Sequence, residues 1–246
     1  MGINLFEFNL FKGYSELCHG VFARSGGVSS GRFDSLNLGL SVGDDPEAVK
    51  ENRGRILEKM ELQRAVYLEQ VHGKTIHVLT EDDGQAPIVA DGVVTQLKGI
   101  ALVIQVADCQ GVLLYDPEQK VIANVHSGWR GSVENIIGDS IDVMATRFKS
   151  DPKDIRAGIS PSLGPCCAEF VNYRDEMPEA MWSYKSPDRP CFDFWALSCD
   201  QMTAKGMKKE NIETMNICTH CSTDQFYSYR REKKTGRFGC VISLKR

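Results

Sequence analysis

The sequence lacks an excess of basic residues: 29 Lys and Arg stand against 33 Asp and Glu, which gives a net charge of −4 in 246 residues. A nucleic-acid-binding protein is not expected, because such proteins carry basic surfaces that neutralise phosphates. Long apolar runs are also missing, since INLFEFNLF near the start is interrupted by Asn, Glu and Asn. No membrane-spanning segment is therefore expected. Because the first residues do not resemble a secretion signal, we expect a cytoplasmic protein.

The chain has nine cysteines, an odd number. A small secreted protein would pair them in disulfides, but neither the length nor the start of this chain suits that class. Those in mixed or apolar surroundings are interpreted as buried reduced thiols: Cys18, Cys191, Cys199 and Cys240. The CTHC segment at 218–221 is half of a zinc knuckle, and the adjacent Cys166 and Cys167 are badly spaced to complete it. We interpret CTHC as a loop that buries or lines a site.

The pattern of apolar residues predicts an α+β fold with a mixed sheet, in a single domain over residues 1–246. Strands are predicted at 64–70, 74–80, 88–95, 100–107, 111–116, 120–126, 155–159, 225–230 and 237–243. Helices are predicted at 46–60, 132–148, 175–184 and 193–206. Asp45 is expected to cap the first helix and Pro46 to begin it. The short connections KG at 98–99 and CQG at 109–111 favour antiparallel neighbours.

Three apolar runs end in residues that bind metals. They are YLEQVHG with His72, LVIQVADC with Cys109 and VIANVHSGWRG with His126. Two imidazoles and one thiolate suit zinc, and three protein ligands leave the fourth position for water or substrate, as in catalytic sites. Alternatively, Cys109 and His126 form a nucleophile with its base. The residues alone leave both interpretations open.

Arginines are the candidates for binding an anion, because a planar guanidinium can hold a phosphate or carboxylate with two hydrogen bonds. Arg130 lies four residues after His126 and between glycines, so it is the best candidate to face the metal pocket. Arg53, on the first predicted helix, is a second candidate. The other arginines considered are Arg24, Arg230 and Arg231. Tyr227 and Tyr229 are interpreted either as a wall of the site or as strand residues of the core.

Nine segments occur in an order that resembles one known family: ARSGGVSSGRFDSLNLG, VGDDPEAVKENR, QVHG, ADGVVT, VADCQGVLLYDP, HSGWRG, LGPCC, CTHC and FYSYRREKKTGR. This is the laccase-domain or polyphenol-oxidase family, whose members are described as purine nucleoside phosphorylases. The resemblance implies an α/β/β/α sandwich related to the cysteine-hydrolase fold of a deamidating toxin. It also implies zinc at His72, Cys109 and His126, with copper as the alternative ion. The chain departs from the family at Gly111, Ser127 and Ala168, which bears on substrate preference.

By the same resemblance, the substrates would be phosphate and purine nucleosides, namely adenosine, inosine, guanosine and methylthioadenosine, with adenosine deamination as a second activity. Catalysis would then involve Cys109, His126 and Arg130, and substrate binding would involve Arg53, Arg130 and Asp108. Because QVHGK and HSGWR contain no glutamate, Asp108 or Glu69 would have to act as the base in deamination.

Two alternative activities remain. One, implied by the related fold and by the peptidoglycan-editing role described for some members of the resembled family, is an amidase that uses cysteine or zinc to edit peptidoglycan precursors. The other is weak, copper-dependent oxidation of phenols. Five histidines are too few for the copper centres of a multicopper oxidase, which excludes laccase chemistry by that mechanism.

Overall fold

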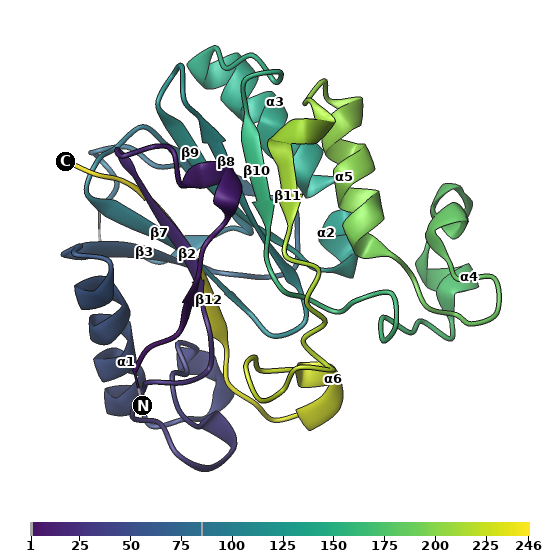
Figure 1. Ribbon diagram of the computed structural model, residues 1–246, viewed down its shortest axis with the longest axis horizontal. Coiled ribbons are helices and arrows are strands. Elements are labelled where there is room, and N and C mark those ends of the chain that lie inside the picture. The colour runs from purple at the N-terminus through teal and green to yellow at the C-terminus, as the bar shows by residue number, and fades with distance from the viewer. Residues whose placement is uncertain (1, 85) are drawn as a thin grey trace.

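Two mixed β-sheets form the centre of the structure, a computed structural model that describes residues 2–84 and 86–246 (Figure 1). The first sheet contains, in spatial order, β1 Leu5–Phe6, β2 Leu17–Phe22, β12 Phe238–Leu244, β7 Ile100–Val106, β3 Arg64–Glu69 and β5 Ile88–Val89. The second contains β11 Ile212–Thr214, β10 Arg156–Ile159, β8 Gln110–Asp116, β9 Val121–Ser127, β6 Gly92–Thr95 and β4 Ile76–Val78. Each sheet combines antiparallel pairs at its centre with parallel pairs such as β3–β7 and β4–β6.

Helices cover the outer face of each sheet. The α-helices are α1 Pro46–Lys59, α2 Trp129–Val133, α3 Ile136–Phe148, α4 Tyr173–Glu176, α5 Phe194–Ala204 and α6 Tyr229–Glu232. Shorter 3₁₀ helices are η1 Asn9–Phe11, η2 Gly31–Phe33, η3 Leu40–Val42, η4 Glu179–Tyr184 and η5 Lys209–Asn211. One apolar cluster joins α1 to the first sheet, another joins α3 and α5 to the second, and a third fills the space between the sheets. The order of layers is helix, sheet, sheet, helix.

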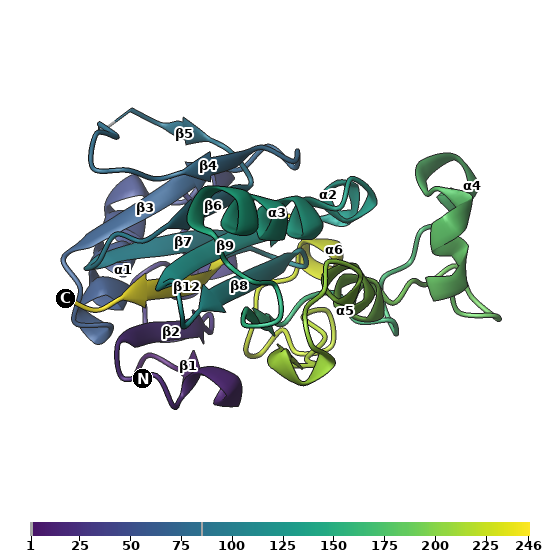
Figure 2. The ribbon, with the colours of Figure 1, turned by 90° about the horizontal axis from the view of Figure 1, so that it is seen from above.

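One segment of the chain lies outside the four layers. The segment that carries α4 and η4 protrudes from the layers (Figure 2), and an apolar cluster joins its base to α2 and α5. No helix in the described part of the chain is long and apolar enough to cross a membrane.

Most predicted elements are present, and the differences have local causes. The prediction of α1 is confirmed, with the Asp45 side chain accepting a hydrogen bond from the Glu47 amide and Pro46 in the first turn. The predicted helix at 132–148 is instead two helices, because Asn135 adopts a left-handed conformation with φ of 58° and caps α3. The predicted helix at 175–184 is divided between α4 and η4 around Pro178.

Three predictions about strands are wrong. The single strand predicted at 88–95 is two strands, β5 in the first sheet and β6 in the second. Residues 225–230 form no strand and lead into α6, whose first turn is capped by the Ser228 side chain. The short connections at 98–99 and 109–111 do not join antiparallel neighbours, because β7 lies in the first sheet while β6 and β8 lie in the second. Each connection therefore carries the chain across the gap between the sheets. Strands β1, β2 and β11 were not predicted.

A buried asparagine links the two sheets near their centre. Along β9, alternate side chains face α3 and the first sheet, as strand geometry requires. Asn124 faces the first sheet, and its Nδ2 donates to the carbonyl oxygens of Leu102 in β7 and Cys240 in β12 at 2.9 and 2.8 Å. His126, two residues further along β9, lies on the same face of the strand, so the functional site begins where this inner layer ends.

We expect Asn124→Ala to lower the free energy of unfolding by about 1–3 kcal/mol, because two buried carbonyl groups lose their donor. Urea denaturation should detect this as a lower transition midpoint with an unchanged slope. Gln96→Ala is the matched control, because the Gln96 amide makes one exposed hydrogen bond, to Gln119 O. Equal midpoints for the two variants would contradict the role of Asn124.

Candidate metal centre and cavity

The three residues at the predicted strand ends converge in the structure. His72 follows β3, Cys109 lies in the connection between β7 and β8, and His126 is near the end of β9. Their ligand atoms all lie within 4.8 Å of one another. The rings of His72 and His126 meet edge to face, with centroids 4.7 Å apart. A set of two nitrogen donors and one sulfur donor is thus assembled from three separate segments.

A buried aspartate that the sequence analysis did not select holds two of these segments. The Asp91 carboxylate accepts hydrogen bonds from His126 Nδ1 at 2.7 Å and from the amides of His72 and Gly73 at 2.9 and 2.8 Å. The bond to Nδ1 leaves Nε2 of His126 free to face Cys109 and a metal ion, which is how carboxylates orient metal-binding histidines. The available signal was an acid in the apolar run IVADGVV, where an unpaired charge would be costly to bury.

The connection that carries Cys109 is held by its neighbour Asp108. Asp108 has a φ of 91°, which is unusual for a residue with a side chain. Its carboxylate accepts hydrogen bonds from the hydroxyls of Thr219 and Ser228, each at 2.7 Å, and from the Arg230 amide at 2.5 Å. Strained backbone of this kind persists only where surrounding contacts enforce it, and such contacts often occur at functional sites. Asp108 lines the cavity, and its carboxylate is already engaged by these donors.

The electrostatics of the three residues favour a thiolate. Burial by itself would raise the pKa of Cys109, but the neighbouring imidazoles of His126 and His72 lower it to about 6. Burial would likewise lower the pKa of His126, but the Cys109 sulfur and the Asp91 carboxylate raise it to about 9. Although burial opposes the ionisation of Asp91, its hydrogen bonds lower the pKa of that carboxyl. A thiolate is the form of cysteine that binds metals and also the form that acts as a nucleophile.

The space around these ligands fits a metal ion. Gly128 is the N-cap residue of α2, and a Cβ atom at this position would lie 3.1 Å from both Cys109 Sγ and His72 Cδ2. Any larger residue would therefore crowd the donor atoms. Two imidazole nitrogens and one thiolate are a donor set that both zinc and copper accept, and three protein ligands leave a coordination position open.

A cavity of about 680 Å³ opens beside the three ligands. Aromatic side chains form part of its wall: Trp129, Phe170, Phe194 and Tyr229. The polar groups include Gln70, Gln105 and Glu69. Ser127 and Ala168, where the chain departs from the resembled family, also line it, whereas Gly111 is not among the lining residues. A cavity that combines an aromatic wall with hydrogen-bonding groups is typical of a site for a planar organic ligand.

The two arginines that the sequence analysis preferred, Arg130 and Arg53, lie outside this lining. Arg130 is exposed on α2, with its guanidinium carbon 5.2 Å from the centroid of the Trp129 ring. Arg53 donates from Nε and Nη2 to Leu38 O at 3.0 and 2.8 Å and stacks on Tyr67. It also reaches the cavity residue Gln105 through Nη2. The structure therefore places Arg53 behind the wall of the cavity, where it supports that wall.

Two other arginines line the cavity instead, Arg230 and Arg237. Arg230 donates from Nη1 to Glu169 O at 2.8 Å, and Arg237 donates to the carbonyls of Thr235 and Gly236, each at 3.0 Å. Among the described residues, neither guanidinium is within ion-pair distance of a carboxylate. Burial lowers the pKa of Arg237. These two charges are available to an anionic ligand.

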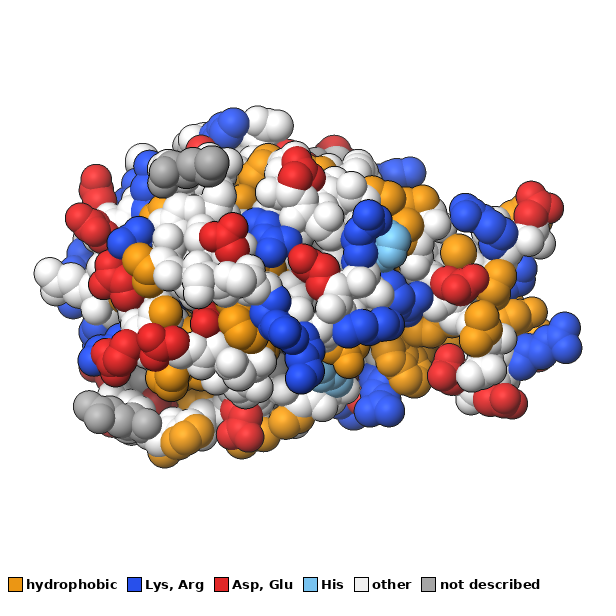
Figure 3. Space-filling model, turned by 90° about the horizontal axis from the view of Figure 1, so that it is seen from below, with side chains coloured by type: hydrophobic (Ala, Val, Ile, Leu, Met, Phe, Trp, Pro, Cys, Tyr) orange, Lys and Arg blue, Asp and Glu red, His pale blue; other side chains and the backbone are white. Residues whose placement is uncertain are grey.

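The surface beside the cavity is also basic. Lys and Arg side chains gather on the face that carries α6, next to the base of the protruding segment (Figure 3). Arg230 and Arg231 belong to α6. Basic side chains close to a cavity raise the local concentration of anions, even in a protein whose net charge is −4.

Known proteins resemble this chain both in sequence and in fold. A purine nucleoside phosphorylase of Pseudomonas aeruginosa is 35% identical over 233 residues, which cover 91% of this chain and 92% of that protein. One of Corynebacterium glutamicum is 37% identical over 236 residues, which cover 90% and 92%. The crystal structure of YlmD from Geobacillus stearothermophilus superposes with a TM-score of 0.90 at 30% identity, covering 100% of this chain and 97% of that one.

A second crystal structure, of the hypothetical protein YfiH from Bacillus licheniformis, gives a TM-score of 0.87 at 28% identity and covers 93% of each chain. The family model described as multi-copper polyphenol oxidoreductase laccase matches residues 18–245, nearly the whole sequence. The chain therefore belongs to this laccase-like family, whose curated relatives include proteins named purine nucleoside phosphorylase.

Proposed function

We propose that the protein is a metal-dependent purine nucleoside phosphorylase. The observation that carries the proposal is the position of His72, Cys109 and His126 beside an aromatic cavity. The same cavity is lined by Arg230 and Arg237, which have no ion-pair partner among the described residues. The names of the curated relatives support the same activity. Proposed substrates are inorganic phosphate with adenosine, inosine, guanosine or methylthioadenosine.

In this proposal His72, Cys109 and His126 hold a zinc ion, with Asp91 fixing the ring of His126. Zinc would supply Lewis-acid stabilisation of negative charge on an oxygen or nitrogen of the substrate. The aromatic side chains Trp129 and Phe170 would pack against the purine base. Arg230 and Arg237 would hold phosphate, so that one of its oxygens can form a bond to C1′ of the ribose while the bond from C1′ to the base nitrogen breaks.

Adenosine deamination is a second proposed activity of the same site. Replacement of an amino group by water requires a proton acceptor near the metal. Of the two carboxylates considered from the sequence, Asp108 is engaged by three hydrogen bonds, whereas Glu69 lines the cavity. We therefore assign the role of base to Glu69.

A thiol hydrolase is the alternative that one observation favours. In the series Cys109, His126 and Asp91, the carboxylate orients the imidazole and the imidazole lowers the pKa of the thiol. Cysteine hydrolases use the same arrangement of nucleophile, base and orienting group. An amidase acting on a peptidoglycan precursor would use Cys109 in this way, without a metal.

We expect one equivalent of zinc to be lost from His72→Ala, and the same equivalent from Cys109→Ala. Each change removes one of three ligands, so the remaining two should not retain the ion at micromolar concentrations. Elemental analysis for zinc and copper, with Cys199→Ser as the control thiol variant, measures this directly. Full retention of metal in both ligand variants would refute the site, and stoichiometric copper would change the identity of the ion.

We expect adenosine and inosine to be cleaved only when phosphate is supplied, with ribose 1-phosphate as a product. Arg230→Ala and Arg237→Ala should each reduce kcat/KM for phosphate by roughly 10- to 150-fold, which corresponds to about 1.5–3 kcal/mol for one charge-assisted hydrogen bond. The control Arg147→Ala changes an exposed arginine on α3 and should have no effect.

Arg130→Ala, measured in the same assay, distinguishes the two placements of the anion site. A large effect at Arg130 with none at Arg230 or Arg237 would return the phosphate site to the position predicted from the sequence. Base release at an unchanged rate without phosphate would identify a hydrolase.

We expect Cys109 to resist alkylation in the metal-loaded protein and to react after chelation. A thiolate that is bound to zinc has its charge and lone pairs committed to the metal, which shields it from electrophiles. Mass spectrometry that resolves each cysteine, with Cys199 as the internal comparison, gives the rates. Fast modification of Cys109 while zinc is retained, with activity lost in parallel, would favour the thiol hydrolase.

A further inference from the structure

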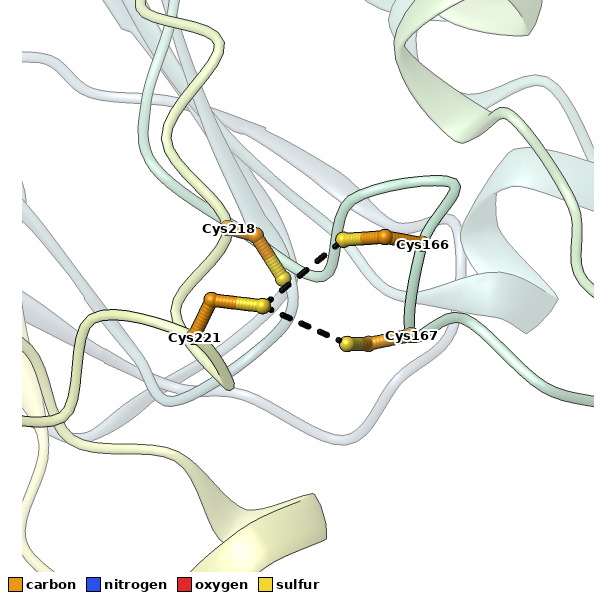
Figure 4. Close-up of side chains that lie close together, drawn as sticks. All are labelled: Cys166, Cys167, Cys218 and Cys221. Carbon is orange, nitrogen blue, oxygen red and sulfur yellow. Dashed lines mark hydrogen bonds between the residues drawn. The ribbon is translucent and has the colours of Figure 1, made fainter.

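Two pairs of cysteines from distant parts of the sequence meet on the surface beside the cavity (Figure 4). Cys166 and Cys167 lie in the turn that follows Gly164, and Cys218 and Cys221 lie in the CTHC segment. The four sulfur atoms all lie within 4.8 Å of one another. Cys221 Sγ is 3.8 Å from Cys166 Sγ and 3.5 Å from Cys167 Sγ. The second pair that CTHC needs to complete a zinc site is therefore present, contrary to the interpretation from spacing.

The distances suit four ligands of one ion. Zinc–sulfur bonds of about 2.3 Å in a regular tetrahedron place the sulfurs about 3.8 Å apart. A disulfide requires about 2.05 Å, much less than either measured distance, and all nine cysteines are free in the structure. Iron–sulfur clusters place several ions and sulfides between their cysteines, which need wider separation than these four sulfurs have.

The backbone of the CTHC segment has the form of a metal-binding turn. Cys218 O accepts hydrogen bonds from the amides of Cys221 and Ser222, at 3.2 and 3.0 Å, so the two sulfurs of the C-x-x-C pair are directed to one side. On the other segment, Gly164 O accepts from the amides of Cys167 and Ala168, each at 2.9 Å. Both cysteine pairs are thus held in short hydrogen-bonded turns.

The two turns are also joined to each other. A parallel bridge pairs Ser162 with Cys218, and the Thr219 amide donates to Ser162 O at 3.0 Å. The burial of the cysteines is uneven, since Cys218 is buried while Cys166 and Cys221 are exposed. Clustered exposed thiols are prone to oxidation unless they are bound to something, and these lie where the fold already holds them together.

We propose that Cys166, Cys167, Cys218 and Cys221 bind a second zinc ion, which is a closed structural site separate from the His72, Cys109 and His126 site. Four thiolates fill a tetrahedral zinc and leave no position for substrate, as in structural sites. This site goes beyond the proposed phosphorylase activity and does not depend on it.

The two turns that would bind the second zinc ion also contact the segment that carries Cys109. The first turn continues into Leu163 and Ala168, which line the cavity, and the Leu163 amide donates to Asp108 O at 2.9 Å. The second turn contains Thr219, whose hydroxyl donates to the Asp108 carboxylate. Asp108 in turn precedes Cys109. The second zinc would therefore hold the two loops that fix the conformation of the Cys109 segment.

The test is a count of zinc in the full-length protein, purified without chelator. We expect two equivalents in the unmodified chain, one in Cys218→Ser, one in His72→Ala and none in the double variant. Cys199→Ser, which changes a thiol outside both groups, should retain two. A Cys218→Ser protein with the same zinc content as the unmodified chain would refute the site. So would a disulfide among these four cysteines, or iron with sulfide, in freshly purified protein.

A second measurement covers the case in which Cys218→Ser fails to fold. Cobalt-substituted His72→Ala protein should show the charge-transfer absorbance of a tetrathiolate ion, with one cobalt per chain. The absence of that absorbance in folded protein would overturn the proposal. Two zinc ions in a protein without phosphorylase activity would support the second site while the proposed function fails, so the two outcomes are distinguishable.

Discussion

The functional centre depends on one buried carboxylate. Asp91 is fully buried, and it accepts hydrogen bonds from the ring of His126 and from the backbone of His72 and Gly73. A charge in this position is stable only because each of its bonds comes from a donor on a neighbouring segment. Those donors belong to the strand and the loop that supply the two imidazoles. The same interaction that compensates the buried charge therefore brings two ligands together and sets which nitrogen of His126 faces the third.

A second carboxylate, that of Asp108, fixes the position of the sulfur ligand Cys109. It holds a backbone conformation that a residue with a side chain rarely adopts, and its three donors come from the CTHC segment and from the start of α6. One of these donors, the Arg230 amide, belongs to a residue whose side chain lines the cavity. The position of Cys109 and the position of a guanidinium are thus linked through one side chain. If the four cysteines bind zinc, that linkage extends to the surface of the protein.

Cys109 can act in two ways at this site, as a ligand of a metal ion or as a thiol nucleophile. The lowered pKa of Cys109 suits both, because a thiolate is the reactive form in each case. The position of His72 favours the metal. A cysteine nucleophile needs only His126 as its base and Asp91 to orient that base. The imidazole of His72 lies close to the same sulfur and supplies a further nitrogen donor, which acyl transfer does not require. Arg230 and Arg237 line the cavity and form no ion pair within the described part of the chain, which is consistent with an anionic co-substrate such as phosphate.

Much of the fold was predictable from local pattern, because periodicity reports which face of a strand or helix is buried. It placed α1 with its cap and the long strands β3, β7, β8, β9 and β12 within a few residues of their positions. The same pattern cannot report which sheet a strand joins. The connections at 98–99 and 109–111 are short enough for hairpins, yet they cross between sheets, since the two layers are close enough for a few residues to span the gap.

The sequence by itself determined the chemical types at the centre, since His72, Cys109 and His126 stand at the ends of apolar runs whose pattern predicts strands of a core. Only the tertiary structure decided which groups surround them. Asp91, Arg237 and the meeting of Cys166 and Cys167 with Cys218 and Cys221 depend on contacts between segments far apart in sequence. Arg130, adjacent in sequence to the centre, is instead exposed on α2. The reason is geometric: spacing along a chain sets the direction of a side chain within its own element, while the packing of elements sets what that side chain meets.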